Sequence, residues 1–182
     1  MSPIVHAEMS WLLGHWLKDR RDRLLIVAAG VVLDVDGLTI LAGEDWYGRL
    51  HHKITHGVLA AIVIVAVTTL FARARWRVAL TAGLVFHLHV LSDLVGSGPG
   101  WPLYYWIPFS QTEWFWDGQW DLASWQNALI GLGVTIACLL SALWAKRTFV
   151  EVFSKTWDQR VVFTIRQRFQ KPDSRIHETR SE

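Results

Sequence analysis

Histidine and aspartate residues lie inside segments of this sequence that are otherwise strongly apolar. His89 and Asp93 are four residues apart, as are His52 and His56, so each pair would share one face of a helix. An ionisable side chain in an apolar helix is costly unless it has a partner or a cavity. Neutral imidazole together with carboxylate is a donor set that suits zinc, manganese or iron. The pattern therefore indicates a metal site.

Polar residues in two earlier segments could join this site. Asp34 and Asp36 lie toward the end of one apolar segment, and Gly37 could break the helix there so that both turn inward. We predict that the metal ligands come from these segments and from the two His pairs, and that the histidines nearby shuttle protons. The predicted ligands are His6, Asp34, Asp36, His56, His89 and Asp93, and the predicted proton-transfer residues are His51 and His52.

The donor set also sets the expected metal content. Two aspartates and two histidines fill one site, and His6 with a shared Asp93 oxygen could begin a second. We expect one or two divalent ions, with zinc favoured and manganese or iron as alternatives. Cys138 is the single cysteine, so a cysteine-based zinc site is excluded. The other histidines are expected to be structural or on the surface: His15, His87 and His177.

The elements that position these residues are predicted to be membrane helices. The chain is 52% hydrophobic and 19% charged and has 12 Trp, a balance unusual for a soluble domain of 182 residues. We predict an all-α polytopic membrane helix bundle of four to five helices, with four if the first segment lies in the interface. The apolar segments are Ile4–Leu17, Leu24–Ala42, Gly57–Ala72, Val78–Val95 and Ala128–Ala145.

Basic residues predict the orientation of the helices. The clusters Lys18–Arg23 and Arg73–Arg77, and the pair Lys146 and Arg147, belong on the cytoplasmic side. The loop 96–127 has no Lys or Arg and belongs outside. Five helices would place the N-terminus outside, and four would place it inside, which would remove His6 from the site. All the polar segments then meet at one face, so we expect an integral protein of a bacterial inner membrane with an extracytoplasmic site.

The chain is predicted to have two parts. Residues 1–147 would form the helix bundle with the metal site, and residues 148–182 a cytoplasmic tail, amphipathic and then charged. Such a tail would lie on anionic lipid, and its last residues would be frayed. The outer loop is rich in aromatic rings, which suit the headgroup layer and would guide an amphipathic, lipid-like substrate. The net charge of +2 gives no reason to expect a nucleic-acid partner.

The assembled residues resemble the YdjM-like family of membrane-bound, predicted metal-dependent hydrolases over roughly Ile4 to Ser110. The resemblance rests on the order and spacing of the elements rather than on any one of them. These are His6, Asp34-Val35-Asp36, His51 to His56 with Thr55 before the last His, His89 to Asp93 followed by a Gly-rich turn, and Trp106-Ile107-Pro108-Phe109-Ser110. The sequence departs from the family pattern at Leu33, His52, Gly57 and after Asp93, so the ligands are kept while residues around them differ.

The order of these residues is also distantly similar to the order of the first metal-site residues in zinc phospholipase C and P1 nuclease. This likeness implies an α-helical phosphoesterase-type site. By that likeness, His6 and Asp93 would serve one metal, while His56 and His89 would serve another with Asp93 and Asp34 or Asp36. No His lies between His89 and His177, so the ligands of a third metal are missing.

These observations favour a membrane-bound, metal-dependent hydrolase that uses metal-activated water on a phosphoester or lipid-headgroup bond. The alternative is a non-catalytic integral subunit of a larger membrane complex that keeps the metal-site scaffold and binds other membrane proteins. A proton or ion pathway is less favoured, because Gly57–Ala72 and Ala128–Ala145 carry no charge through their middles.

Overall fold

The computed structural model describes residues 1–170, in which all the regular elements are helices. Residues 171–182, which include His177 and the end of the predicted tail, lie outside the described residues. The chain divides into two compact units, Met1–Thr135 and Ile136–Glu182. The prediction of an all-α fold is confirmed for the described part of the chain.

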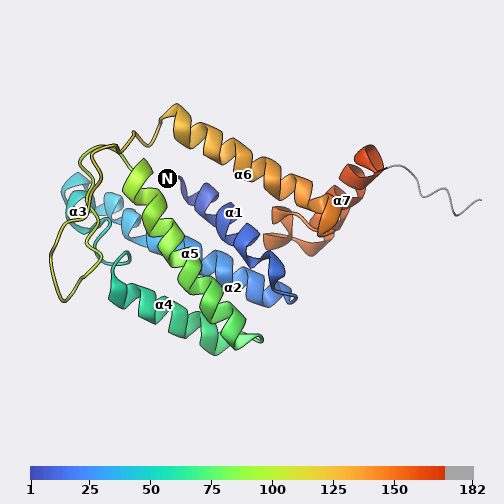
Figure 1. Ribbon diagram of the computed structural model, residues 1–182, viewed down its shortest axis with the longest axis horizontal. Coiled ribbons are helices and arrows are strands. Elements are labelled where there is room, and N and C mark those ends of the chain that lie inside the picture. The colour runs from blue at the N-terminus through green and yellow to red at the C-terminus, as the bar shows by residue number, and fades with distance from the viewer. Residues whose placement is uncertain (171–182) are drawn as a thin grey trace, which may run out of the picture. The chain divides into compact units, whose positions relative to one another are not determined.

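The first unit is a bundle in which α1, α2, α4 and α5 run side by side (Figure 1). Helix α2 contacts each of the other three. The elements are α1 (Pro3–Leu13), the 3-10 helix η1 (Gly14–Trp16), α2 (Arg20–Val31), the 3-10 helix η2 (Val32–Ala42), α3 (Glu44–Leu50), α4 (Val58–Phe71), α5 (Arg75–Gly96) and the first part of α6 (Trp125–Trp144).

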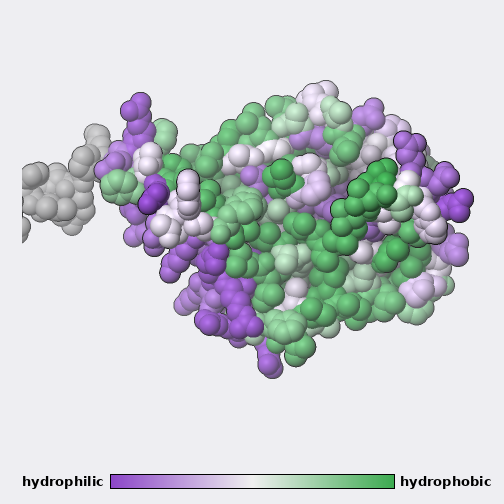
Figure 2. Space-filling model, turned by 180° about the vertical axis from the view of Figure 1, so that it is seen from behind, coloured by the Kyte–Doolittle hydropathy of each residue, from purple (hydrophilic) through white to green (hydrophobic). Residues whose placement is uncertain are grey.

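Three helical stretches are long and apolar enough to cross a membrane, which indicates an integral membrane protein. They are Arg20–Ala42, formed by α2 and η2 together, then α5 and α6. Helix α4 is also apolar but has only 14 residues, and α1 has 11. On the face drawn in Figure 2, hydrophobic residues gather over the middle of the first unit and hydrophilic residues lie toward its ends.

The core of the bundle lies where α2 meets α5. Ile26 and Ala29 of α2 are buried against Val78, Ala82 and Val85 of α5. Small side chains such as Ala29 and Ala82 let the two backbones approach closely, which is how helices associate when lipid weakens the hydrophobic effect. A second buried cluster, Leu33, Ala61 and Phe86, lies nearer the other end of these helices.

Two of the predicted basic clusters meet at one end of the bundle. The buried Asp22 carboxylate accepts hydrogen bonds from the backbone N–H groups of Arg73 and Ala74, at 2.8 and 2.9 Å, and so ties α2 to the turn before α5. Arg73 also pairs with Asp19. Because a helix rises 1.5 Å per residue, Asp93 lies about 27 Å along α5 from Arg75, close to the opposite end.

The second unit continues from the last part of α6 through the 3-10 helix η3 (Phe149–Val152) to α7 (Lys155–Phe169). The buried Asp158 carboxylate accepts hydrogen bonds from the backbone N–H and hydroxyl of Thr148, both at 2.7 Å. Trp157 and Phe163 of α7 are exposed. The predicted tail therefore contains a helix with exposed aromatic residues, and its contact with lipid stays a prediction.

At Gly30, α2 lies close to both α1 and α5. A Cβ atom at this position would lie 1.9 Å from Ser10 Oγ, 2.8 Å from Ser10 Cβ and 3.0 Å from Val85 Cγ1. The Ser10 Cβ atom is tied to the α1 backbone, so the clash could be relieved only by moving α1. Glycine at position 30 therefore lets α1 approach α2 closely enough to bring His6 toward α5.

We expect Gly30→Ala to destabilise the protein by roughly 1–3 kcal/mol, because overpacking would push α1 away from α2. Thermal unfolding of the purified protein in detergent would measure this effect. Gly133→Ala is a matched control, since no atom lies within 4 Å of a Cβ built at Gly133. Equal unfolding temperatures for the two variants would contradict the proposed close packing.

Candidate metal centre

Histidine and aspartate side chains from different elements converge at the end of the bundle opposite the basic loops. His6 of α1, Asp34 of η2, and His89 and Asp93 of α5 place potential ligand atoms within 4.8 Å of one another. His52 and His56, from the connection between α3 and α4, form a second such group with the same Asp93. Two groups that could each hold a metal ion thus share one carboxylate.

The groups are buried, which makes their arrangement costly without compensation. Asp93, His6, His52 and His89 are each 2% exposed, and His56 is fully buried. Paired ionisable groups in such an environment must be neutralised by protons, by one another or by a cation.

Several ligand atoms of these groups have no hydrogen-bond partner, although they are buried. Among residues 1–170, such atoms occur at a few other positions, but most of them belong to the two groups. A divalent cation bound among these side chains would satisfy such atoms where their lone pairs are free. The atoms are Asp34 Oδ2, His52 Nδ1, His56 Nε2, His89 Nε2 and Asp93 Oδ2.

The hydrogen bond to Gly30 fixes which nitrogen of His89 is free. His89 Nδ1 lies 2.8 Å from the Gly30 carbonyl oxygen, which can only accept, so Nδ1 must carry the proton. In the neutral ring Nε2 then has a lone pair, and it lies 3.0 Å from Asp93 Oδ2 and 3.6 Å from Asp34 Oδ1. A lone pair facing two carboxylates is repelled, so Nε2 must either carry a proton or bind a cation that lies between them. A backbone-anchored imidazole of this kind is typical of metal ligands.

The distances between ligand atoms fit a tetrahedral metal. Bonds of about 2.0–2.1 Å from a central ion separate neighbouring ligands by about 3.3 Å. His6 Nε2 lies 3.2 Å from Asp93 Oδ1, and His56 Nε2 lies 3.4 Å from Asp93 Oδ2. His52 Nε2 is more distant, at 3.9 Å from Asp93 Oδ2. The Met1 amino nitrogen also contacts Asp93, at 2.6 Å from Oδ1.

Asp36 orients the histidines instead of joining either group. Its Oδ1 lies 2.7 Å from His51 Nδ1, and its Oδ2 accepts from the backbone N–H of His52 at 3.1 Å and lies 3.2 Å from His56 Nδ1. Both carboxylate oxygens are therefore engaged. Holding Nδ1 of His56 in this way directs Nε2 toward Asp93, as second-layer carboxylates do in metal sites.

The two histidines of the second group have opposite electrostatic surroundings. Burial, with the nearby positive charge of His56, lowers the pKa of His52 to about 3. Burial alone would lower the pKa of His56, but the adjacent Asp36 and Asp93 carboxylates outweigh it and raise that pKa to about 9. A proton on His56 thus partly neutralises two aspartates, and a divalent ion would replace that proton with a larger charge.

A pocket of about 540 Å³ leads to the shared carboxylate. Asp93, Asp34 and His52 line its inner part. Tyr47 stacks on His51 with ring centroids 4.5 Å apart, and Trp101 meets both His51 and His52 edge-on. The pocket therefore combines potential metal ligands with an aromatic wall.

The outer loop is anchored over the end of α5. The Gln119 side chain donates to the carbonyl oxygens of Leu94 and Trp101, and the Asn127 side chain donates to that of Gly96. These bonds hold Trp101 at the pocket, whereas Trp106 and Phe109 of the same loop are exposed. The loop thus contributes the aromatic ring of Trp101 to the pocket, while several of its other aromatic rings lie on the surface.

The structure brings together most of the residues that the sequence predicts as ligands. His6, Asp34, His89 and Asp93 form one group and His56 belongs to the other, but Asp36 lies behind His51 and His56. His52, predicted as a proton-transfer residue, is a member of the second group. His51 lines the pocket. The spacing of residues in the sequence could not show that Asp34 joins a ligand group and that Asp36 does not. It also did not indicate that Tyr47 and Trp101 would line the pocket.

His15 and His87, the described histidines predicted to be structural or on the surface, lie outside both groups. His87 bonds through Nδ1 to the Gly83 carbonyl oxygen and through Nε2 to the Tyr105 hydroxyl, at 2.7 and 2.9 Å. His15 packs edge-on against Trp11.

No protein-family model, curated protein or solved structure matches this chain.

We expect Asp36→Asn to weaken metal binding by about 10- to 100-fold without abolishing it, because the variant keeps the ligands but loosens the orientation of His56. Titration of the metal-free protein with Zn²⁺ would measure the dissociation constants. Asp45→Asn, at an exposed position of α3, controls for loss of an acidic charge. An affinity equal to that of the wild type would show that Asp36 does not act on the site.

Proposed function

We propose that this chain is a membrane-bound, metal-dependent hydrolase that acts on a phosphoester bond of an amphipathic, lipid-like substrate. The observation that carries this proposal is the pair of buried ligand groups that share Asp93 and border an aromatic-walled pocket. A structural metal site would normally be closed by four protein ligands, whereas the second group has three and leaves a position open.

Divalent ions, with zinc favoured and manganese or iron as alternatives, would supply the activation of water and the stabilisation of charge on a phosphoryl group. His6, Asp34, His89 and Asp93 would hold one ion, and His52, His56 and Asp93 the other. Asp93 would be common to both ions, because His6 lies near its Oδ1 while His89 of the first group and His56 of the second both lie near its Oδ2.

His51 is the residue best placed to move a proton. Its Nδ1 donates to Asp36 Oδ1 at 2.7 Å, so the lone pair of the neutral ring is on Nε2. The ring lines the pocket beside Tyr47 and is not a member of either ligand group. A histidine held by a carboxylate in this way has a fixed tautomer and orientation, which favours transfer of a proton to a leaving group.

The surroundings of the pocket favour a substrate with an apolar part. Tyr47, Trp101, Leu38 and Leu122 line it together with the acidic and histidine side chains. Its position at one end of apolar, membrane-length helices would place it at headgroup depth.

The proposed side of the membrane is extracytoplasmic, in a bacterial inner membrane. The basic clusters at Lys18–Arg23 and Arg73–Arg77 lie at the opposite end of the bundle, and such clusters favour the cytoplasmic side. The resemblance to the YdjM-like family supports a membrane-bound, metal-dependent hydrolase. The runner-up function is a non-catalytic integral subunit that binds other membrane proteins.

The test measures metal content and turnover in the same samples. We expect the wild-type protein, purified in mild detergent and supplied with Zn²⁺, to bind metal and to hydrolyse a fluorogenic short-chain phosphoester. Asp93→Asn should lose both properties, because the shared carboxylate would no longer neutralise the ions. His87→Gln is the control, since His87 lies outside both ligand groups.

The two measurements separate the alternatives. Metal binding without turnover on phosphomonoesters and phosphodiesters would contradict the hydrolase and favour the accessory subunit. Absence of bound metal in the wild type, by elemental analysis, would contradict both functions that depend on the site.

A further inference from the structure

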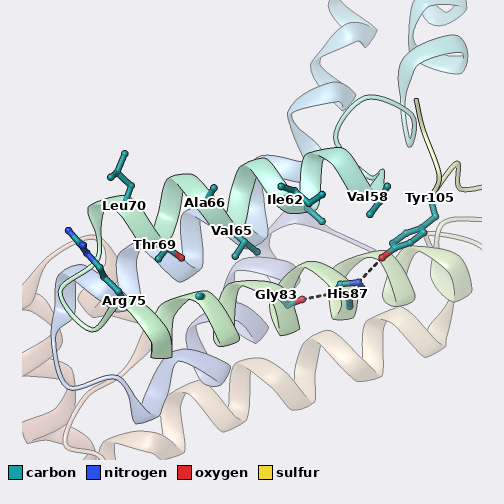
Figure 3. Close-up of a pocket in the computed structure, with 12 residues that line it drawn as sticks. Val58, Ile62, Val65, Ala66, Thr69, Leu70, Arg75, Gly83, His87 and Tyr105 are labelled. Carbon is teal, nitrogen blue, oxygen red and sulfur yellow. Dashed lines mark hydrogen bonds between the residues drawn. The ribbon is translucent and has the colours of Figure 1, made fainter. Parts of the chain in front are cut away.

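An apolar groove of about 730 Å³ runs between α4 and α5, separate from the pocket at the metal centre (Figure 3). It extends along α4 from Val58 to Leu70, which corresponds to about 18 Å of helix. Aliphatic side chains of α4, including Ile62 and Val65, form one wall, and residues of α5 line the other side. None of the residues that line this groove lines the pocket at the metal centre.

Small residues on both helices create the hollow. Ala66 of α4 and Ala79 and Gly83 of α5 leave space where larger side chains would fill the gap between the helices. A Cβ atom built at Gly83 would have no atom within 4 Å. The groove is therefore open at Gly83 and can receive an elongated apolar group.

The two ends of the groove differ in their polar chemistry. At one end His87 and Tyr105 satisfy each other through a 2.9 Å hydrogen bond (Figure 3). Arg75 and Thr69 line the other end (Figure 3). The buried Thr69 Oγ1 has no hydrogen-bond partner among the described residues. The Arg75 end thus has one unsatisfied buried hydroxyl beside a charged side chain.

Arg75 is the arginine of its cluster that is available to a ligand. Arg73 pairs with Asp19, and the Arg77 guanidinium lies over the rings of Trp16 and Trp76, at 5.6 and 5.3 Å from their centroids. Arg75 is exposed, and within residues 1–170 no acidic side chain pairs with it. A cation at the mouth of an apolar groove is complementary to an anionic amphiphile.

We propose that this groove binds one acyl chain of an anionic glycerophospholipid, with the lipid phosphate at Arg75 and Thr69. The chain would lie along Ala79 and Gly83 toward the His87–Tyr105 pair. The lipid would come from the leaflet on the Arg75 side of the membrane. That end of α5 lies far from Asp93, so this lipid is a bound ligand and not the substrate of the metal centre. The site does not depend on the proposed hydrolase function.

Filling the groove tests the position of the acyl chain. The full-length protein would be reconstituted with phosphatidylglycerol and washed with delipidating detergent, and the retained lipid would be counted by mass spectrometry. We expect Gly83→Leu to reduce retained phosphatidylglycerol at least about fivefold, because the new side chain would occupy the hollow. Gly133→Leu, at an equally open helical glycine of α6, should retain the wild-type amount.

Removing the charge tests the position of the headgroup. We expect Arg75→Gln to reduce the preference for phosphatidylglycerol over phosphatidylcholine about 10-fold, as the loss of a charge-assisted hydrogen bond implies. Arg73→Gln, at the neighbouring arginine that pairs with Asp19, should keep that preference.

Each outcome decides part of the proposal. Equal lipid retention in the Gly83→Leu and Gly133→Leu proteins would overturn the groove as the binding site. A second outcome is that Gly83→Leu loses lipid while Arg75→Gln keeps the wild-type preference for phosphatidylglycerol over phosphatidylcholine. This would overturn the position of the headgroup at Arg75 and would place the headgroup at the Tyr105 end of the groove. Metal content should be unchanged in all four variants, so a failed metal centre would not be mistaken for a failed lipid site.

Discussion

The buried Asp93 carboxylate is the group on which the other features of the site depend. It lies near the end of α5, is almost completely buried, and faces histidines from three different parts of the chain. A carboxylate in this position needs positive charge close by, which the Met1 amino group supplies on the Oδ1 side and which the histidines supply only by holding protons. A divalent ion shared through Asp93 would neutralise it and would also satisfy the neighbouring atoms that have no hydrogen-bond partner.

The rest of the bundle is arranged so that these side chains can meet. The absence of a side chain at Gly30 lets α1 approach α2, and the Gly30 carbonyl oxygen holds His89 with Nε2 toward the aspartates. Asp36 similarly anchors His51 and His56 from the far side. The donor atoms are thus oriented by the protein itself, an arrangement that lowers the cost of collecting ligands around an ion.

Much of this arrangement could be predicted from the sequence, because ionisable residues in apolar segments are costly and the basic loops orient the helices. The placement of His56, His89 and Asp93 at one end follows from those two constraints, whereas that of His6 depended on whether the short first segment spans the membrane. The separate roles of Asp34 and Asp36 could not be predicted, since they depend on the 3-10 geometry of η2. The position of His52 could not be predicted either. Its backbone adopts φ 65°, a conformation that few non-glycine residues use.

X-ray absorption spectroscopy of the zinc-loaded protein tests the central claim most directly, because it reports ligand types and metal–metal distances. Two ions sharing Asp93 predict nitrogen and oxygen ligands at about 2.0–2.1 Å and a second metal at roughly 3.5–4 Å. The metal–metal signal should disappear in Asp93→Asn. Sulfur ligation, or a spectrum unchanged by that substitution, would contradict the assignment of Asp93 as the shared ligand.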